Sequence, residues 1–190
     1  MRGMILTNVS GNYWYNSKDK LYIHLPLDFN IAANLGYLGR NKNECMFDIE
    51  DHVITRVVKT SVTNRLIQIY VDKNNEMIVQ FIEFIPNKVE LREVVSFIWE
   101  WFDLVRDLNL FYELAKGDTL LKKTVKEFHG LRVIGVPDLF EALCWGILGQ
   151  QINLAFAYTL KRRLLKNLES PSNGMVRNIG ASLPINRLLN

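Results

Sequence analysis

The spacing of apolar residues changes at Pro86, and this change limits the possible folds more than any other feature of the sequence. Before Pro86, short runs rich in β-branched and aromatic residues are separated by polar turns; these runs are LYIHLPLDF, ECMFDIE, HVITRVVKT, RLIQIYVD and MIVQFIEF. After it, segments such as KVELREVVSFIWEWFDLV carry apolar residues at helical spacing. A strand-rich half followed by a helical half predicts an α+β fold whose antiparallel strands are joined by hairpins.

Local signals suggest where the parts of the chain begin and end. The first run alternates, which places four apolar side chains on one face: Leu21, Ile23, Leu25 and Leu27. Asp28 is placed to cap the helix that FNIAANLGYL predicts, and Gly39 is placed to end it. We therefore expect an N-terminal extension over residues 1–20, an antiparallel α+β domain over 21–86 and a helical domain over 87–168.

The composition is that of a globular protein, and its charge is weakly informative. With 48% hydrophobic residues, ten Phe, four Trp and seven Tyr, the 190-residue chain is too apolar for intrinsic disorder. The net charge of +3 is too small to identify a nucleic-acid binder by itself. Between Leu120 and Leu165, however, seven Lys and Arg residues stand against three acidic ones. This basic region is either a binding surface or an ordinary solvated face.

The sequence gives no pattern for a metal, a disulfide framework or a membrane span. Cys45 and Cys144 lie far apart, and the three histidines are scattered at His24, His52 and His129. We expect no metal and no other cofactor, with both cysteines as buried free thiols. Because the chain has no run of 18 apolar residues and no signal-peptide pattern, we expect a cytoplasmic protein.

Three side-chain amides lie at the junction between two predicted apolar helices, in the stretch FEALCWGILGQQINLAFAYTLKRRLL. The apolar residues before them have the spacing of a helix that buries one face: Phe140, Leu143, Cys144, Ile147 and Leu148. Gly149 suits the end of that helix, and Gln150, Gln151 and Asn153 follow it. Amides are costly to bury without partners. They therefore either cap the helix junction or face a partner outside the fold.

The sequence FHGLRVIGVPDLFEALCWGILGQQINLAFAYTLKRRL resembles the alkylation-repair DNA glycosylases of the 3-methyladenine glycosylase II type, in the helix-hairpin-helix glycosylase superfamily. The resemblance is carried by GLR, by a helix start at Pro137 and Asp138, by FEAL, by ILGQQ and by small residues in the next helix. PLDFNIAANLGYL and WEWFDLVRDLNLFYELAK match the family more weakly. Together these segments cover residues 20–168.

The resemblance implies a TBP-like antiparallel sheet with a helix, followed by the first part of an all-α glycosylase domain. It also implies base-excision repair: binding of double-stranded DNA and removal of alkylated purines, 3-methyladenine among them, by flipping the base out of the stack. Such enzymes act as monomers and need no metal. The alternative is a fragment that binds DNA without catalysis.

The resemblance assigns roles to individual residues, each with a structural alternative. Gln151, with Gln150 beside it, matches the wedge that fills the gap left by the flipped base; capping the helix junction is the alternative. Tyr37 matches an aromatic residue at the edge of the base pocket, and the alternative is a core aromatic. We expect Trp145 to pack inside. Lys161, Arg162 and Arg163 either contact phosphates or form a solvated helix end; these three follow the wedge on the next helix.

The family's catalytic aspartate follows a hairpin of the LPGIGxWTA type, and neither is found in this sequence, whose last aspartate is Asp138. Residues 169–190 do not resemble the family, and in a shifted reading frame the codons for residues 166–180 permit EFGESIEWNGKKYW, which does. We therefore expect a frameshift near Leu165 to Leu168, with a natural end as the alternative. On this basis the chain is expected to be inactive, and its exposed apolar surface could cause self-association.

Overall fold

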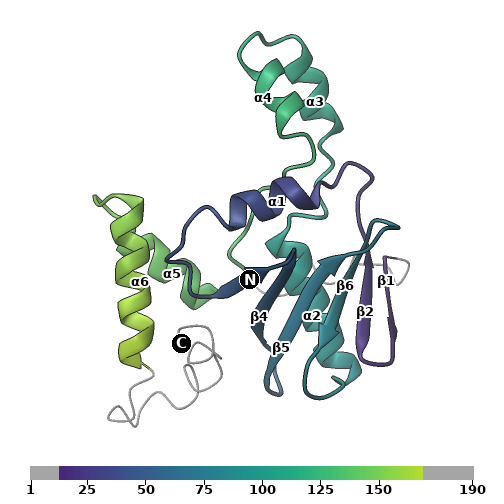
Figure 1. Ribbon diagram of the computed structural model, residues 1–190, viewed down its shortest axis with the longest axis vertical. Helices are drawn as coiled ribbons and strands as arrows, with labels where there is room; N and C mark the ends of the chain where they lie inside the picture. The colour runs from purple at the N-terminus through teal and green to yellow at the C-terminus, as the bar shows by residue number, and fades with distance from the viewer. Residues whose placement is uncertain (1–12, 169–190) are drawn as a thin grey trace.

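The computed structural model describes residues 13–168, which form one six-stranded antiparallel sheet and six helices (Figure 1). The strands lie in the order β1-β2-β6-β5-β4-β3, and their bounds are β1 Trp14–Ser17, β2 Lys20–His24, β3 Phe47–Glu50, β4 Val53–Lys59, β5 Asn64–Val71 and β6 Glu76–Phe81. The α+β prediction is thus confirmed. The expected tail, residues 169–190, lies outside the described residues.

The first two strands differ from the pattern expected for them. β2 buries Leu21 and Ile23 but ends at His24, and Leu27 is fully exposed. The chain turns there because the carbonyl of Pro26 accepts a hydrogen bond from the Phe29 amide. β1 lies within the expected extension and pairs with β2 through a tight turn, so residues 14–17 belong to the sheet. Its short, aromatic sequence has too little alternation to predict a strand.

The helices begin and end close to where the sequence predicted them. Their bounds are α1 Ile31–Leu38, α2 Lys88–Trp101, α3 Asn109–Lys116, α4 Leu121–Glu127, α5 Leu139–Leu148 and α6 Leu154–Leu168. α1 ends at Gly39 as expected, but its N-cap is Asn30, whose side chain accepts the Ala33 amide. Asp28 does not cap α1, because its carboxylate is held by Arg132 instead.

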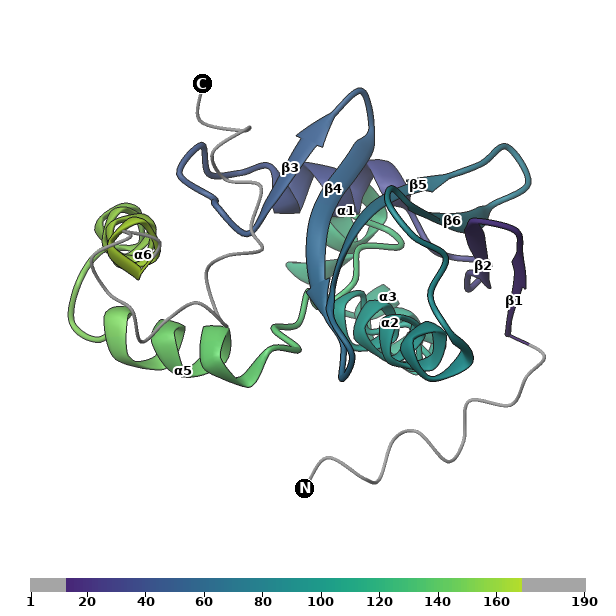
Figure 2. The ribbon, with the colours of Figure 1, turned by 90° about the horizontal axis from the view of Figure 1, so that it is seen from below.

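One core joins the sheet to α1 and α2. The apolar face of α2, including Val94 and Ile98, and the C-cap residue Phe102 are fully buried against Ile54, Ile67 and their neighbours on the strands. Figure 2 shows α2 running along one face of the curved sheet. α2, which the sequence placed in the helical half, therefore completes the core of the sheet.

The remaining helices form two pairs that stand away from this core. The α3–α4 pair projects from one end, and α5 and α6 lie beyond the β3 edge of the sheet (Figures 1 and 2). The expectation that α5 buries its apolar face is wrong, because Phe140, Leu143 and Ile147 are 45%, 56% and 69% exposed. No helix between residues 13 and 168 has both the length and the apolar character to cross a bilayer.

Candidate nucleic-acid interface

The corner between α5 and α6 is defined by its caps. Asp138 accepts the Glu141 amide and starts α5, as predicted, and Gly149 ends it with a hydrogen bond to the Trp145 carbonyl. Asn153 accepts the Phe156 amide at 2.9 Å and so caps α6. Capping therefore accounts for one of the three amides at the corner.

The other two amides are not used in this way. Gln150 and Gln151 are both exposed, and their side chains form no hydrogen bond with any residue that the structure describes. Gln151 also has a φ of 57°, in the left-handed region that costs a non-glycine residue about 1 kcal/mol. The corner thus presents two amide side chains outward, one of them on a strained backbone.

Tyr37 lies near the end of α1 at the rim of a cavity of about 210 Å³. The ring is 40% exposed, which rejects the alternative of a core aromatic. The Arg40 guanidinium lies 3.7 Å from its ring centroid and covers one face. Across the cavity are side chains of α5 and α6, so residues far apart in sequence share this space; the aromatic ones are Tyr37, Phe47, Trp101, Trp145 and Tyr158.

Trp145 is half-buried rather than enclosed, and it packs against α6. Its ring meets Tyr158 edge to face, with centroids 4.7 Å apart, and the Lys161 ammonium lies 4.7 Å from its centroid. This contact ties the end of α5 to the middle of α6.

The expectation for Lys161 needs correction. Its side chain is 3% exposed, and its ammonium pairs with Glu141 at 2.8 Å and with Glu44 at 3.3 Å. It points toward the sheet, and its two ion pairs hold the ammonium away from a DNA phosphate at the surface. Arg163 is exposed and Arg162 is half-buried, and neither forms an ion pair within residues 13–168. The basic run at this helix is therefore divided between a buried Lys161, a half-buried Arg162 and an exposed Arg163.

The sequence reasoning missed the partners of Lys161. Arg56 lies on the core side of β4, where its neighbours in the alternation are Ile54 and Val58, and its guanidinium donates to Glu141 at 2.8 Å. Burial by itself would raise the pKa of Glu141, but the charges of Arg56 and Lys161 outweigh it and hold that pKa below its usual value. A charged residue at an inward strand position was a signal that Arg56 has a buried partner, although it does not identify that partner.

The GLR motif joins α1 to the start of the α5–α6 region. The Gly130 carbonyl accepts from the Asn30 amide and from the Asn34 side chain, both at 3.1 Å. The buried Arg132 donates from its backbone amide to Asn34 and from its guanidinium to Asp28. This network fixes the helix that carries Tyr37 against the segment leading into α5.

The two cysteines differ from the expectation of buried thiols. Cys45 and Cys144 are free and only half-buried, and burial raises the pKa of the Cys45 thiol to about 11, which leaves it unreactive. Within the described part of the chain, no three His, Cys, Asp or Glu side chains cluster as a metal would require.

Comparison with known proteins identifies the class to which this fold belongs. The family described as 8-oxoguanine DNA glycosylase, N-terminal domain, matches residues 26–143. The solved structure of a 3-methyladenine DNA glycosylase from Archaeoglobus fulgidus superposes with a TM-score of 0.66 at 18% identity, covering 77% of this chain and 50% of that one. An 8-oxoguanine glycosylase/lyase from Clostridium acetobutylicum gives 0.56 at 16% identity, covering 83% and 48%. At these identities the likeness shows the DNA glycosylase fold.

A nearer relative narrows the class. The DNA-3-methyladenine glycosylase of Bacillus subtilis (strain 168) is 53% identical over 156 residues, which are 80% of this chain and 51% of that protein. The chain therefore belongs to the DNA glycosylases that share the matched N-terminal domain, with a 3-methyladenine glycosylase as a relative at 53% identity, and it spans about half the length of the relatives it matches.

Proposed function

We propose that this chain provides the DNA-binding and base-extruding part of a base-excision repair glycosylase that acts on alkylated purines in the cytoplasm. The observation that carries the proposal is the α5–α6 corner, where Gln150 and Gln151 expose side chains that no described residue binds. Two of the solved relatives hold DNA, one of them double-stranded DNA with cytosine opposite 8-oxoguanine, and their names support the same class of partner.

The corner has the chemistry that base extrusion requires. A base inside a duplex cannot be reached by an enzyme, so it must be unstacked and the gap held open. The planar amide of Gln151 can fill such a gap and donate to, or accept from, the unpaired partner base. The left-handed backbone at Gln151 holds this side chain at the tip of the corner.

Tyr37 and the cavity beside it suit an alkylated purine. Such bases carry positive charge, which favours aromatic faces through cation–π attraction and stacking. Tyr37 at the rim, with Trp145 and Tyr158 on the far wall, offers these faces. Arg40 already covers one face of Tyr37, so a purine would use the ring's edge or its other face.

Release of the extruded base requires a further group, a carboxylate that acts on the sugar. Cleavage of the N-glycosidic bond develops positive charge on the sugar, and a carboxylate usually stabilises it. Glu141, the acidic residue of the corner helices, is buried and paired with Arg56 and Lys161. We therefore propose that this chain binds and unstacks DNA without releasing a base, and that incubation with DNA containing 3-methyladenine yields no free base.

The wedge is tested by unstacking rather than by cleavage. A duplex carrying the fluorescent base 2-aminopurine brightens when that base leaves the stack. Replacing Gln150 and Gln151 by alanine should lower this signal at saturating protein by at least about fivefold, while the Kd changes by no more than about threefold, because phosphate contacts supply most of the affinity. Gln68→Ala, on β5, is the matched control. Undiminished brightening in the double variant would show that the corner is no wedge.

Phosphate contacts are tested by the salt dependence of affinity. Arg162→Ala together with Arg163→Ala should reduce the slope of log K against log salt by up to about 1.8, because each lost phosphate contact removes about 0.9. Lys161 is buried in its ion pairs, so Lys161→Met should leave that slope unchanged. Fluorescence anisotropy titrations at salt concentrations from about 50 to about 200 mM, a fourfold range, would measure this slope. An unaltered slope in the double arginine variant would remove both residues from the interface.

A further inference from the structure

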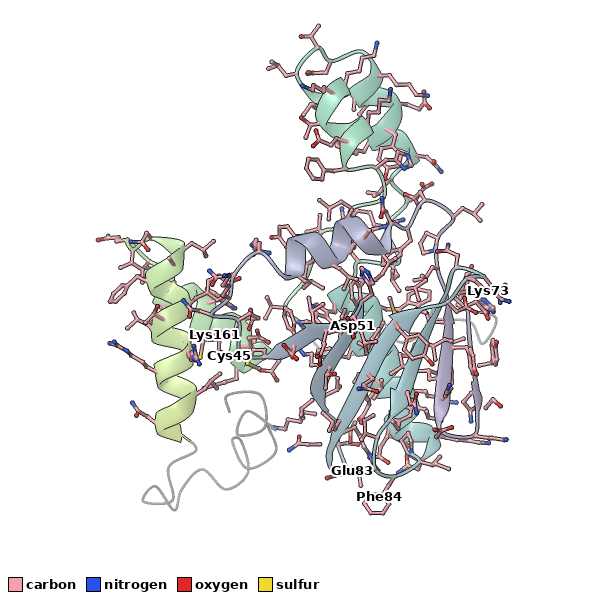
Figure 3. All side chains as sticks on the ribbon, in the orientation of Figure 1. Cys45, Asp51, Lys73, Glu83, Phe84 and Lys161 are labelled. Atoms are coloured by element: carbon pink, nitrogen blue, oxygen red, sulfur yellow. The ribbon has the colours of Figure 1, made fainter. Side chains whose placement is uncertain are left out.

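Four charged side chains meet between the sheet and the α5–α6 pair. Glu141 binds Arg56 through Oε2 and Lys161 through Oε1, both at 2.8 Å, and Lys161 reaches Glu44 at 3.3 Å. Figure 3 labels Lys161 on the side of α6 that faces the sheet, next to Cys45. We call these four residues the clamp. Two cations and two anions balance, so no charge in it lacks a counterion.

The clamp connects β4, α5, α6 and the loop that follows α1. Arg56 comes from β4, Glu141 from the first turn of α5 and Lys161 from α6. Glu44 belongs to the loop that follows α1, the helix of Tyr37, and it also accepts the backbone amides of Cys45 and Met46. One carboxylate, that of Glu141, therefore touches both the sheet and the second helix of the corner.

Apolar packing does not explain how α5 is held. All ten residues of α5 are described, and Glu141 is the one that is buried. Leu143 and Ile147, on the helix face expected to pack, are more than half exposed. Arg56, by contrast, is enclosed by the rings of Trp101 and Phe97, whose centroids lie 4.5 and 4.8 Å from its guanidinium carbon. The attachment of α5 to the sheet is thus mainly polar.

A small tilt of α5 about Glu141 would produce a larger displacement at the α5–α6 corner. Gln150 lies nine residues after Glu141, which is about 13 Å along a helix. A tilt of about 10° at Glu141 would displace Gln150 by roughly 2 Å. Neighbouring bases in a duplex are about 3.4 Å apart. A displacement of that size would carry the amide out of the gap it has to fill.

We propose that Glu141 is the positioning residue of the wedge, fixing the corner with Gln150 and Gln151 relative to the sheet through Arg56, Lys161 and Glu44. The wedge itself rests on the function proposed above. The fixing of the corner does not, because it is a property of the free protein.

The free protein is tested first, by amide hydrogen exchange. Glu141→Gln removes one charge at constant shape. It should raise exchange by about tenfold or more across residues 145–158 and leave β5 unchanged. Glu113→Gln, which breaks the exposed Glu113–Lys116 pair, is the matched control and should change neither region. Equal acceleration in β5 and at the corner would reduce Glu141 to a general stabilising residue, and no acceleration at the corner would overturn the clamp.

DNA binding then separates positioning from affinity. With the 2-aminopurine duplex, the fluorescence increase at saturating protein should be at least about fivefold smaller for Glu141→Gln than for the wild type. The Kd of the variant should stay within about twofold of the wild-type value. Adding Lys161→Met restores charge balance and should recover at least half of the lost signal. Loss of signal in strict proportion to affinity, or no recovery in the double variant, would contradict positioning. A wild-type chain that does not bind DNA at all would end the proposed function, whereas the clamp would still be decided by hydrogen exchange.

Discussion

Gly130→Ala is expected to destabilise the protein by about 4 kcal/mol, a large part of the free energy of unfolding of an ordinary domain. Gly130 has a φ of 83°, where a side chain is disfavoured, and an added Cβ would overlap the Asp28 carbonyl oxygen and lie 2.8 Å from Cβ of Asn30. The backbone cannot withdraw without breaking the bonds from Asn30 and Asn34 to the Gly130 carbonyl. Urea unfolding followed by circular dichroism would measure the loss as a lower midpoint.

Gly146→Ala provides the matched control for this effect. Gly146 lies inside α5, and an added Cβ would meet nothing within 4 Å. Alanine is the better helix former by about 1 kcal/mol, so this variant should be as stable as the wild type or more so. If Gly130→Ala shifted the midpoint no more than Gly146→Ala does, the close approach of α1 to residues 128–132 could not be what fixes that helix.

The fold could be predicted from the sequence where the pattern of burial is regular. β4 shows this, because Ile54 and Val58 alternate as a half-buried strand should, and α2 shows it through the spacing of Val94 and Ile98. β1 could not be predicted, because four residues contain too few alternations and its stability comes from pairing with β2. Short strands at the edge of a sheet depend on tertiary pairing that no local pattern records.

Part of the candidate site could be predicted from the sequence: the exposed amides could, and the buried ion pairs could not. Gln150 and Gln151 were identified because two amides at an apolar helix junction are conspicuous, and their exposure agrees with that interpretation. Lys161 was misplaced because a lysine in a basic run looks solvated. Its actual partners, Glu141 and Glu44, are 20 and 117 residues away, and no local signal could pair them. Long-range ion pairs are therefore the part that needs the structure.

Glu90→Leu is expected to cost about 3 to 4 kcal/mol, because removing one member of a buried ion pair leaves the other uncompensated. Glu90, in the first turn of α2, is 1% exposed, and it accepts two hydrogen bonds from Arg65, at 2.9 and 2.8 Å. It also accepts the Asn87 amide at 3.0 Å and completes the capping box that starts α2. Glu100→Gln, at an exposed position near the end of the same helix, should change stability by less than about 0.5 kcal/mol.

The charge of Glu90 also predicts how stability depends on pH. The hydrogen bond from Arg65 is the main cause that holds the pKa of Glu90 below its ordinary value. A lowered pKa in the folded state contributes stability that is fully present above the unfolded value of about 4.3 and is lost as the pH falls through the folded pKa. Glu90→Gln lacks the ionisable carboxylate. Its free energy of unfolding should therefore fall furthest below that of the wild type at neutral pH, and the difference should shrink below about pH 4. A deficit that stayed constant from pH 7 to pH 3 would show that shape alone, and not the charge, makes Glu90 necessary for α2 to dock on the sheet.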